Sequence, residues 1–221
     1  MARCIRIGFI TTDMHNFPTT GLYIITDSDR LDFSTLYQRT ESILEAGVPV
    51  LQYRDKAADQ ATRRERALAI QDLCSQQDTL FLVNDDVQLA RDIGADGVHI
   101  GQGDLPYLEA RQLLGEQAII GVSCYNRLDL ALDAQSQGAD YIAFGAFFST
   151  RTKSQTTPAQ PELLRRAKLE LVIPIIAIGG ITLENGGTLL QTGADLLAVA
   201  SSVYNSNDPI QVVLKFKQLF Q

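Results

Sequence analysis

Eight short apolar runs recur along the chain, and they limit the folds that it can adopt. Most are nearly continuous stretches of apolar or β-branched residues, which is typical of strands in a parallel sheet covered on both faces. Segments with helical spacing lie between them. This alternation predicts an α/β fold, a single (βα)8 TIM barrel with a parallel eight-stranded core, with a doubly wound open sheet as the structural alternative. The runs are Leu22–Thr26, Val48–Tyr53, Leu80–Val83, Gly97–Ile100, Ala118–Val122, Tyr141–Phe144, Ile173–Ile178 and Leu196–Ala200.

Four glycines each stand just before an apolar run, where a helix is expected to end. Three of them open a Gly-Ala-Asp triplet, in which glycine supplies the left-handed residue that ends a helix. This weak repeat, without any linker or low-complexity segment, predicts one catalytic barrel domain over residues 21–221. Residues 1–20 are predicted to be an N-terminal extension of uncertain structure. The four glycines are Gly47, Gly94, Gly138 and Gly193.

The composition excludes several classes of protein. A net charge of −7 argues against a nucleic-acid-binding surface, which needs clustered cations. Cys4, Cys74 and Cys124 are widely spaced, which indicates a reducing compartment rather than a disulfide framework or a zinc site. His15 and His99 are the only histidines, so a multi-histidine metal site is excluded. No apolar run approaches the roughly 18 residues that a membrane helix needs.

Polar residues gather where the strands are expected to end, which is the face that carries the chemistry in such barrels. Gln52, Arg54 and Lys56 alternate along one strand and are therefore predicted to share a face. An amide, a guanidinium and an ammonium group together suit a multiply charged phosphate. The alternative is an exposed strand edge with alternating polar residues.

A second candidate for anion binding follows the sixth run. Thr150–Lys153 offer backbone N–H groups, two hydroxyls and two cations within four positions, although a solvated polar loop is the alternative. Gly179-Gly180 and Ser201-Ser202 follow the last two runs. Phosphate-binding barrels commonly hold a monophosphate at that place.

Carboxylates at neighbouring strand ends indicate a metal site. Asp85 and Asp104, together with a bound polyphosphate, can hold Mg²⁺, which prefers oxygen ligands and needs only one or two protein carboxylates. The alternative is helix capping, which is expected of Asp86 for the segment Val87–Ile93. Asp104, just before Leu-Pro, is also a potential cap.

Ser123 ends the fifth run and is expected to position a substrate or donate a hydrogen bond. No histidine is suitably placed to make it a hydrolase nucleophile, and His99 is expected to be a hydrogen-bonded packing residue. A diphosphate cradle, a Mg²⁺ pair and a second phosphate site suit a reaction in which diphosphate leaves and a phosphorylated substrate attacks. The protein then mainly positions the substrates and neutralises charge.

In order and spacing, these pieces resemble the thiamine-phosphate synthase family over about residues 21–204. Three positions depart from the family pattern, because proline is common at Ala146 and Ser149 and histidine at Tyr125. The matching pieces are Leu22-Tyr-Ile-Ile-Thr-Asp27, Gln52-Tyr-Arg-Asp-Lys56, Asn84-Asp85, Asp96-Gly-Val-His-Ile-Gly-Gln102 with Asp104, Gly121-Val-Ser123, Gly145-Ala-Phe-Phe-Ser-Thr-Arg-Thr-Lys153, Ala177-Ile-Gly-Gly-Ile181 and the serines after the eighth run.

The resemblance implies a cytoplasmic (βα)8 transferase of thiamine biosynthesis with small-molecule substrates and Mg²⁺ as cofactor. It would join 4-amino-5-hydroxymethyl-2-methylpyrimidine diphosphate to a thiazole phosphate, giving thiamine phosphate and pyrophosphate. In the family, ionisation of the diphosphate gives a carbocation that the thiazole nitrogen captures. Neither a nucleic acid nor a membrane is expected as a partner, and a homo-oligomer stays open.

Carried over by position, the site residues divide into three groups. Lys153 and Ser123 would be the catalytic residues, and both would contact the pyrimidine diphosphate. The other pyrimidine diphosphate ligands would be Gln52, Arg54, Lys56 and Asn84. The thiazole phosphate ligands would be Thr150, Arg151, Thr152, Gly180, Ala200 and Ser201, and the Mg²⁺ ligands Asp85 and Asp104.

Two other functions fit part of this pattern. A thiazole tautomerase shares the barrel and the thiazole phosphate pocket but would not need a diphosphate cradle or metal aspartates. A non-catalytic regulatory barrel would bind a phosphate ligand without releasing pyrophosphate. The synthase is favoured by the presence of Gln52, Arg54, Lys56, Asp85, Asp104 and Lys153.

Overall fold

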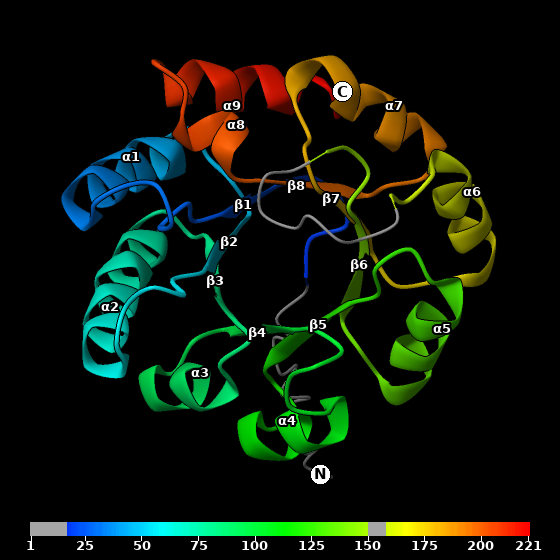
Figure 1. Ribbon diagram of the computed structural model, residues 1–221, viewed down its shortest axis with the longest axis horizontal. Helices are drawn as coiled ribbons and strands as arrows, with labels where there is room; N and C mark the ends of the chain where they lie inside the picture. Colours follow the sequence, from blue (N-terminus) through cyan, green and yellow to red (C-terminus); the bar gives the residue numbers. More distant parts are fainter. Residues whose placement is uncertain (1–16, 150–157) are drawn as a thin grey trace, which may run out of the picture.

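The strands close into a barrel in the computed structural model, which describes residues 17–149 and 158–221. Eight parallel strands follow one another in chain order, and β1 pairs with β8 to complete the ring (Figure 1). This closure confirms the barrel and rules out the open sheet. The strands are β1 (Gly21–Ile25), β2 (Val50–Tyr53), β3 (Leu80–Asn84), β4 (Gly97–Ile100), β5 (Ile119–Ser123), β6 (Tyr141–Gly145), β7 (Ile175–Ile178) and β8 (Leu196–Val199).

The helices form an outer ring around the strands (Figure 1). Side-chain caps set where several begin; for example, Asp86 accepts a hydrogen bond from the backbone N–H of Leu89 at 2.9 Å, as expected for a helix cap. Among the described helices, none combines the length and the apolar character needed to cross a membrane. They are α1 (Phe33–Glu45), α2 (Gln60–Gln76), α3 (Val87–Ile93), α4 (Tyr107–Leu114), α5 (Leu128–Gln137), α6 (Pro161–Glu170), α7 (Leu183–Thr192), α8 (Ser201–Tyr204) and α9 (Pro209–Gln218).

The Gly-Ala-Asp triplets tie neighbouring strands together at the amino ends of the barrel. Gly94 and Gly138 adopt the left-handed conformation that ends α3 and α5. The aspartate of each triplet then accepts a hydrogen bond from the backbone N–H of the first or second residue of the preceding strand. This bond satisfies a donor at the amino end of the barrel. These bonds join Asp96 to Phe81, Asp140 to Ile120 and Asp195 to Ile175, at 2.7, 2.7 and 2.9 Å.

The apolar core has two layers, which explains the continuous apolar runs. Outward-facing strand residues pack with the helices in one large cluster that also contains the buried thiols of Cys74 and Cys124. Inward-facing residues form a second cluster with no helix residue in it. Its strand members are Tyr23, Ile25, Val50, Leu82, Ile119, Tyr141, Ala143, Ile176, Leu196 and Ala198.

The chain just before β1 joins the interior cluster. Phe17 is only 9% exposed, and its ring stacks on that of Tyr141 with centroids 4.1 Å apart. Residues 17–20, predicted as part of an extension, therefore include a side chain of the barrel core. Residues 1–16 lie outside the described residues, and their assignment as an extension stays a prediction.

Gly97 gives a test of the barrel's close packing. A Cβ atom there would lie 1.9 Å from the backbone oxygen of Ile119 on β5, so Gly97→Ala has to separate two paired strands. We expect this change to lower the free energy of unfolding by about 3 kcal/mol. Gly103→Ala is the matched control, because nothing lies within 4 Å of its added Cβ, and it should change stability by less than about 0.5 kcal/mol. Denaturant unfolding measures both; equal stabilities would contradict this packing.

Candidate active site

Charged side chains from three consecutive strand ends meet at the carboxyl rim. Lys56 follows β2, and its Nζ lies 2.9 Å from Oδ2 of Asp85, which follows β3. Asp104, which follows β4, and the side chain of Asn84 lie near enough to Asp85 to influence its pKa. The barrel thus brings together Lys56, Asn84, Asp85 and Asp104, four of the predicted site residues.

The two carboxyl groups of this cluster differ in their affinity for protons. Burial disfavours the charged form of Asp85, but the hydrogen bond and charge of Lys56 outweigh it and lower the pKa of Asp85. Burial raises the pKa of Asp104, and the neighbouring charge of Asp85 adds to that rise. One carboxylate is therefore matched to a cation, while the other lacks an equivalent partner.

Asp104 is not a helix cap. Pro106 occupies the cap position of α4 and makes no side-chain cap bond, whereas Asp104 accepts a hydrogen bond from the backbone N–H of Gly101 at 2.7 Å. Asp85 does not cap α3 either, since Asp86 does. Both aspartates therefore lack the structural role that was the alternative to metal binding.

The donor set at this rim fits Mg²⁺. Two adjacent carboxylates offer the hard oxygen ligands that Mg²⁺ prefers, and substrate phosphate and water ordinarily complete its shell. Among residues 17–149 and 158–221, no group of three or more His, Cys, Asp or Glu side chains forms a denser metal site. A cation shared with the substrate suits this set better than a metal held by protein alone.

The alternation predicted that Gln52, Arg54 and Lys56 share one strand face. They do not. The strand β2 ends at Tyr53, so only Gln52 belongs to it, with a side chain that is 3% exposed inside the barrel. Arg54 and Lys56 lie in the following loop, where Nη1 of Arg54 contacts Oδ2 of Asp29 at 2.7 Å. Loop conformation, rather than the strand pleat, aims these two cations.

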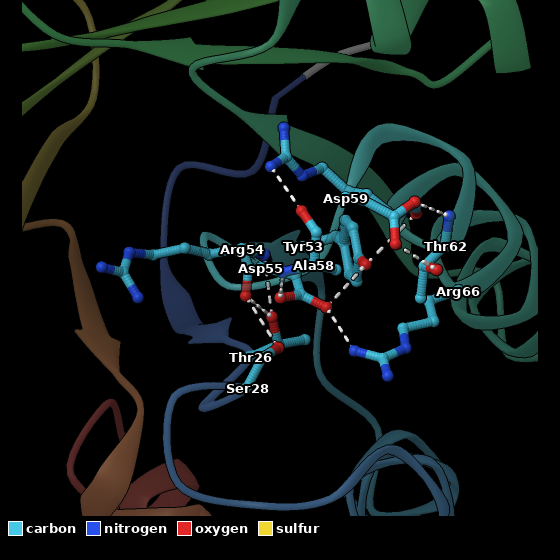
Figure 2. Close-up of polar contacts among 10 residues, drawn as sticks. Thr26, Ser28, Tyr53, Arg54, Asp55, Ala58, Asp59, Thr62 and Arg66 are labelled. Carbon is cyan, nitrogen blue, oxygen red and sulfur yellow. Dashed lines mark hydrogen bonds and ion pairs between the residues drawn. The ribbon is translucent and has the colours of Figure 1, made fainter.

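Hydrogen bonds clamp the backbone of this loop (Figure 2). The carbonyl of Arg54 accepts from the hydroxyls of Thr26 at 2.9 Å and Ser28 at 2.8 Å, and its N–H donates to Thr26. Asp55 is 6% exposed and accepts from Nη1 of Arg66 at 2.9 Å. Figure 2 shows the Arg54 side chain extending away from these contacts. A fixed backbone holds an extended cation.

A pocket of about 650 Å³ opens beside the charged cluster. Lys56, Asn84 and Asp85 contribute to its wall, and Arg63 of α2 and Leu105 extend it outward. Gln52 and Ser123 do not line it. Asp104 and Arg54 are also absent from its lining, and residues of α3 form another part of the wall, so the pocket includes only part of the charged cluster.

The predicted phosphate-binding residues Gly180, Ala200 and Ser201 lie at the rim after β7 and β8. Gly180 has a φ of +63°, and an added Cβ there would lie 2.8 Å from the backbone oxygen of Ser149. The loops after β6 and β7 therefore touch at a position that only glycine suits. Ala200 and Ser201 follow β8 on the same rim. Thr150, Arg151, Thr152 and Lys153 lie outside the described residues.

The structure brings His99 next to Ser123, a contact that the sequence did not predict. Nε2 of His99 is 3.3 Å from Oγ of Ser123, because adjacent strands β4 and β5 point both side chains into the barrel. The other ring nitrogen of His99 contacts the hydroxyl of Tyr141 at 3.0 Å. A tyrosine, rather than a carboxylate, therefore stands where a hydrolase triad needs its acid.

Sequence reasoning also missed Asp29, Tyr23 and Tyr141. The two tyrosines sit in apolar runs whose inward and outward faces look alike in sequence. The available signal was a polar side chain, such as tyrosine, histidine or glutamine, within several of the apolar runs, because such residues can meet inside a barrel.

The sequence matches a known family over most of its length. Residues 22–203 match the family described as thiamine monophosphate synthase. The thiamine-phosphate synthase of Thioalkalivibrio sulfidiphilus is 45% identical, over 91% of this chain and 95% of that protein. That of Nitrosospira multiformis is also 45% identical, over 91% of this chain and 86% of its own length.

A solved structure agrees with these relatives. Thiamine phosphate pyrophosphorylase from Pyrococcus furiosus superposes with a TM-score of 0.81 at 32% identity, over 91% of this chain and 96% of that one. The 3-hexulose-6-phosphate synthase structure, with a TM-score of 0.70 and 14% identity, shares the fold alone. Family match, close relatives and fold coincide, and the chain belongs to the thiamine-phosphate synthase family of transferases.

Proposed function

We propose that this chain joins a pyrimidine diphosphate to a thiazole phosphate at the carboxyl rim of its barrel. The observation that carries the proposal is the ion pair of Lys56 with Asp85 at 2.9 Å, with Asp104 and Asn84 near Asp85. Such a cluster matches a leaving diphosphate with its cation. A thiazole tautomerase would not need this cluster, and a regulatory barrel would bind a phosphate ligand without releasing pyrophosphate.

A bound diphosphate would replace the carboxylate partners of two cations in the site. Arg54 pairs with Asp29 and Lys56 with Asp85, and their side chains are 22% and 56% exposed. An entering diphosphate offers stronger, charge-assisted acceptors at the same rim. In the reaction, the bond between the pyrimidine methylene carbon and the diphosphate oxygen breaks, and the diphosphate keeps the electron pair. Arg54, Lys56 and Lys153 would then neutralise the charge that develops.

Asp85 and Asp104 would hold Mg²⁺, with Asn84 and Gln52 as neutral ligands of the pyrimidine diphosphate. Bound Mg²⁺ supplies positive charge that stabilises the departing diphosphate. Ser123 would contact the pyrimidine. Ser123 is the last residue of β5, at the carboxyl end of the barrel, which supports that placement.

The second substrate would occupy the opposite part of the rim. Thr150, Arg151, Thr152, Gly180, Ala200 and Ser201 would hold its phosphate, as expected after the last strands of a phosphate-binding barrel. The thiazole nitrogen would donate its electron pair to the methylene carbon, forming the new C–N bond. A cytoplasmic location stays a prediction from the resemblance, which leaves the oligomeric state open.

The activity itself is the first test. The full chain, incubated with both substrates and Mg²⁺, should form thiamine phosphate and pyrophosphate in equal amounts, and a chelator should stop the reaction. Chromatography and a coupled pyrophosphate assay measure the products. Binding of thiazole phosphate without product would instead support the regulatory barrel.

The metal ligands are tested by neutral substitutions of adjacent aspartates. Asp85→Asn and Asp104→Asn should each raise the Mg²⁺ concentration needed for half-maximal activity by about tenfold or more, because each removes an anionic ligand. Asp86→Asn is the matched control, since asparagine also caps helices and Asp86 serves α3. A Mg²⁺ titration of initial rates decides. An equal shift in all three variants would point to net charge rather than ligation.

Lys153 is tested by comparing turnover with stability. Lys153→Ala should lower kcat by about a hundredfold or more, because a cation on the leaving group acts mainly in the transition state. Its Tm should stay within a few degrees of the parent. Lys168→Ala removes a lysine that pairs with Asp195 away from the site, and it should keep full turnover. Parallel losses of Tm and kcat in Lys153→Ala would make that lysine structural.

A further inference from the structure

Five polar side chains form one connected path through the interior of the barrel. Nε2 of Gln52 lies 3.0 Å from the hydroxyl of Tyr23, which lies 2.9 Å from that of Tyr141. Nδ1 of His99 lies 3.0 Å from the same Tyr141 hydroxyl, and Nε2 of His99 lies 3.3 Å from Oγ of Ser123. The path links β2, β1, β6, β4 and β5, and it ends at two residues of the proposed pyrimidine site.

Because the interior of the path is buried, the polar hydrogens there need acceptors within the protein. Gln52, Tyr23, Tyr141 and His99 are 3%, 2%, 0% and 8% exposed. Burial also raises the pKa of both tyrosines far above the ordinary value, so both stay neutral hydroxyls. A buried hydroxyl without an acceptor for its single hydrogen carries a desolvation penalty, so the arrangement that satisfies every hydrogen is strongly favoured.

The amide of Gln52 sets the direction of the path. Its NH₂ group only donates, so the oxygen of Tyr23 accepts, and the hydrogen of Tyr23 points to Tyr141. Tyr141 then donates to Nδ1 of His99, which carries a lone pair. Neutral His99 consequently bears its hydrogen on Nε2 and donates it to Ser123.

The reverse direction leaves a hydrogen unsatisfied. If Ser123 donated to His99 and His99 to Tyr141, then Tyr141 would donate to Tyr23. Among the described residues, the Tyr23 hydroxyl bonds only to Tyr141 and the Gln52 amide nitrogen, so its own hydrogen would have no acceptor. The first direction avoids this penalty.

Packing holds the central ring of the path in place. Phe17 stacks on Tyr141 with an interplanar angle of 15°, and the His99 ring lies nearly parallel to it with centroids 5.6 Å apart. A Cβ at Gly121 would fall 1.9 Å from Cζ of Tyr141, so glycine there makes room for the ring. The hydroxyl at the centre of the path is therefore confined to one position.

We propose that Tyr23, Tyr141 and His99 are positioning residues that make Ser123 a hydrogen-bond donor to the substrate. Because Ser123 accepts from His99, its own hydrogen is directed to another acceptor, such as a ring nitrogen of the pyrimidine. The inference rests on the proposed place of Ser123 at the pyrimidine. It assigns the interior path a role in orienting the first substrate rather than in supporting the fold alone.

The direction of the path is measured in the free protein by ¹⁵N NMR of histidine-labelled full chain. The chain has two histidines, so a His15→Gln variant assigns the signals of His99. At pH 8, Nε2 should show the shift of a protonated nitrogen and Nδ1 that of an unprotonated one. A proton on Nδ1 would overturn the proposal.

Gln52→Glu makes this test sharper, because free histidine also favours a proton on Nε2. The introduced carboxylate only accepts, so it should take the hydrogen of Tyr23 and reverse the whole path. The His99 proton should then move to Nδ1. An unchanged His99 signal in this variant, with an intact fold by circular dichroism, would show that the groups are not coupled and would contradict the proposal.

Kinetics test the consequence for the substrate. Tyr141→Phe should lower kcat/KM for the pyrimidine diphosphate about tenfold, the effect of one hydrogen bond, and leave the KM for thiazole phosphate unchanged. Ser123→Ala should lower it at least as much and add nothing in the Tyr141→Phe background. Tyr204→Phe is the matched control. It removes another fully buried tyrosine hydroxyl, which lies 2.8 Å from the hydroxyl of Thr40, and it should keep parental kinetics.

These outcomes separate the inference from the proposed function. Additive losses in the double variant would overturn the coupling while the synthase reaction stands. A fully active Ser123→Ala would remove Ser123 from the site, whatever the NMR shows. A chain without synthase activity would leave the His99 signals as the independent measure of the path.

Discussion

The pairing of β1 with β8 is the contact on which the rest of the molecule depends. It removes both sheet edges, and because all eight strands run parallel, their carboxyl ends form one closed rim. Lys56, Asp85 and Asp104 lie far apart in sequence from Gly180 and Ser201, yet closure gives them a common rim. Closure also buries the inner strand faces, so any polar group there has to find a partner inside the barrel.

Two cations of the proposed site form ion pairs with carboxylates that a substrate phosphate would replace. Arg54 and Lys56 each contact a carboxylate, and the loop that carries them is clamped through its backbone by Thr26 and Ser28. Rigid loops with exchangeable partners limit the reorganisation needed when a diphosphate binds. In the proposed mechanism, the interior path applies the same principle to neutral groups, because it would orient Gln52 and Ser123 before the pyrimidine binds.

Much of the architecture was predictable, and the misses have a common origin. All eight apolar runs became strands, and Asp86 became the helix cap that its position indicated. The shared face of Gln52, Arg54 and Lys56 was wrong, because a strand end depends on where its neighbours stop pairing. The nearness of His99 to Ser123 was missed for the same reason: register between strands is a tertiary property.

The sequence by itself determined the order of strands and helices, the turns that end the helices and the kinds of chemical group available at the rim. These depend on local periodicity, glycine conformation and side-chain chemistry. Only the tertiary structure decided which inward residues meet, that Phe17 belongs to the core, and that Tyr141 stands between Tyr23 and His99. Continuous apolar strands look alike on both faces, so closing the barrel was required to distinguish inside from outside.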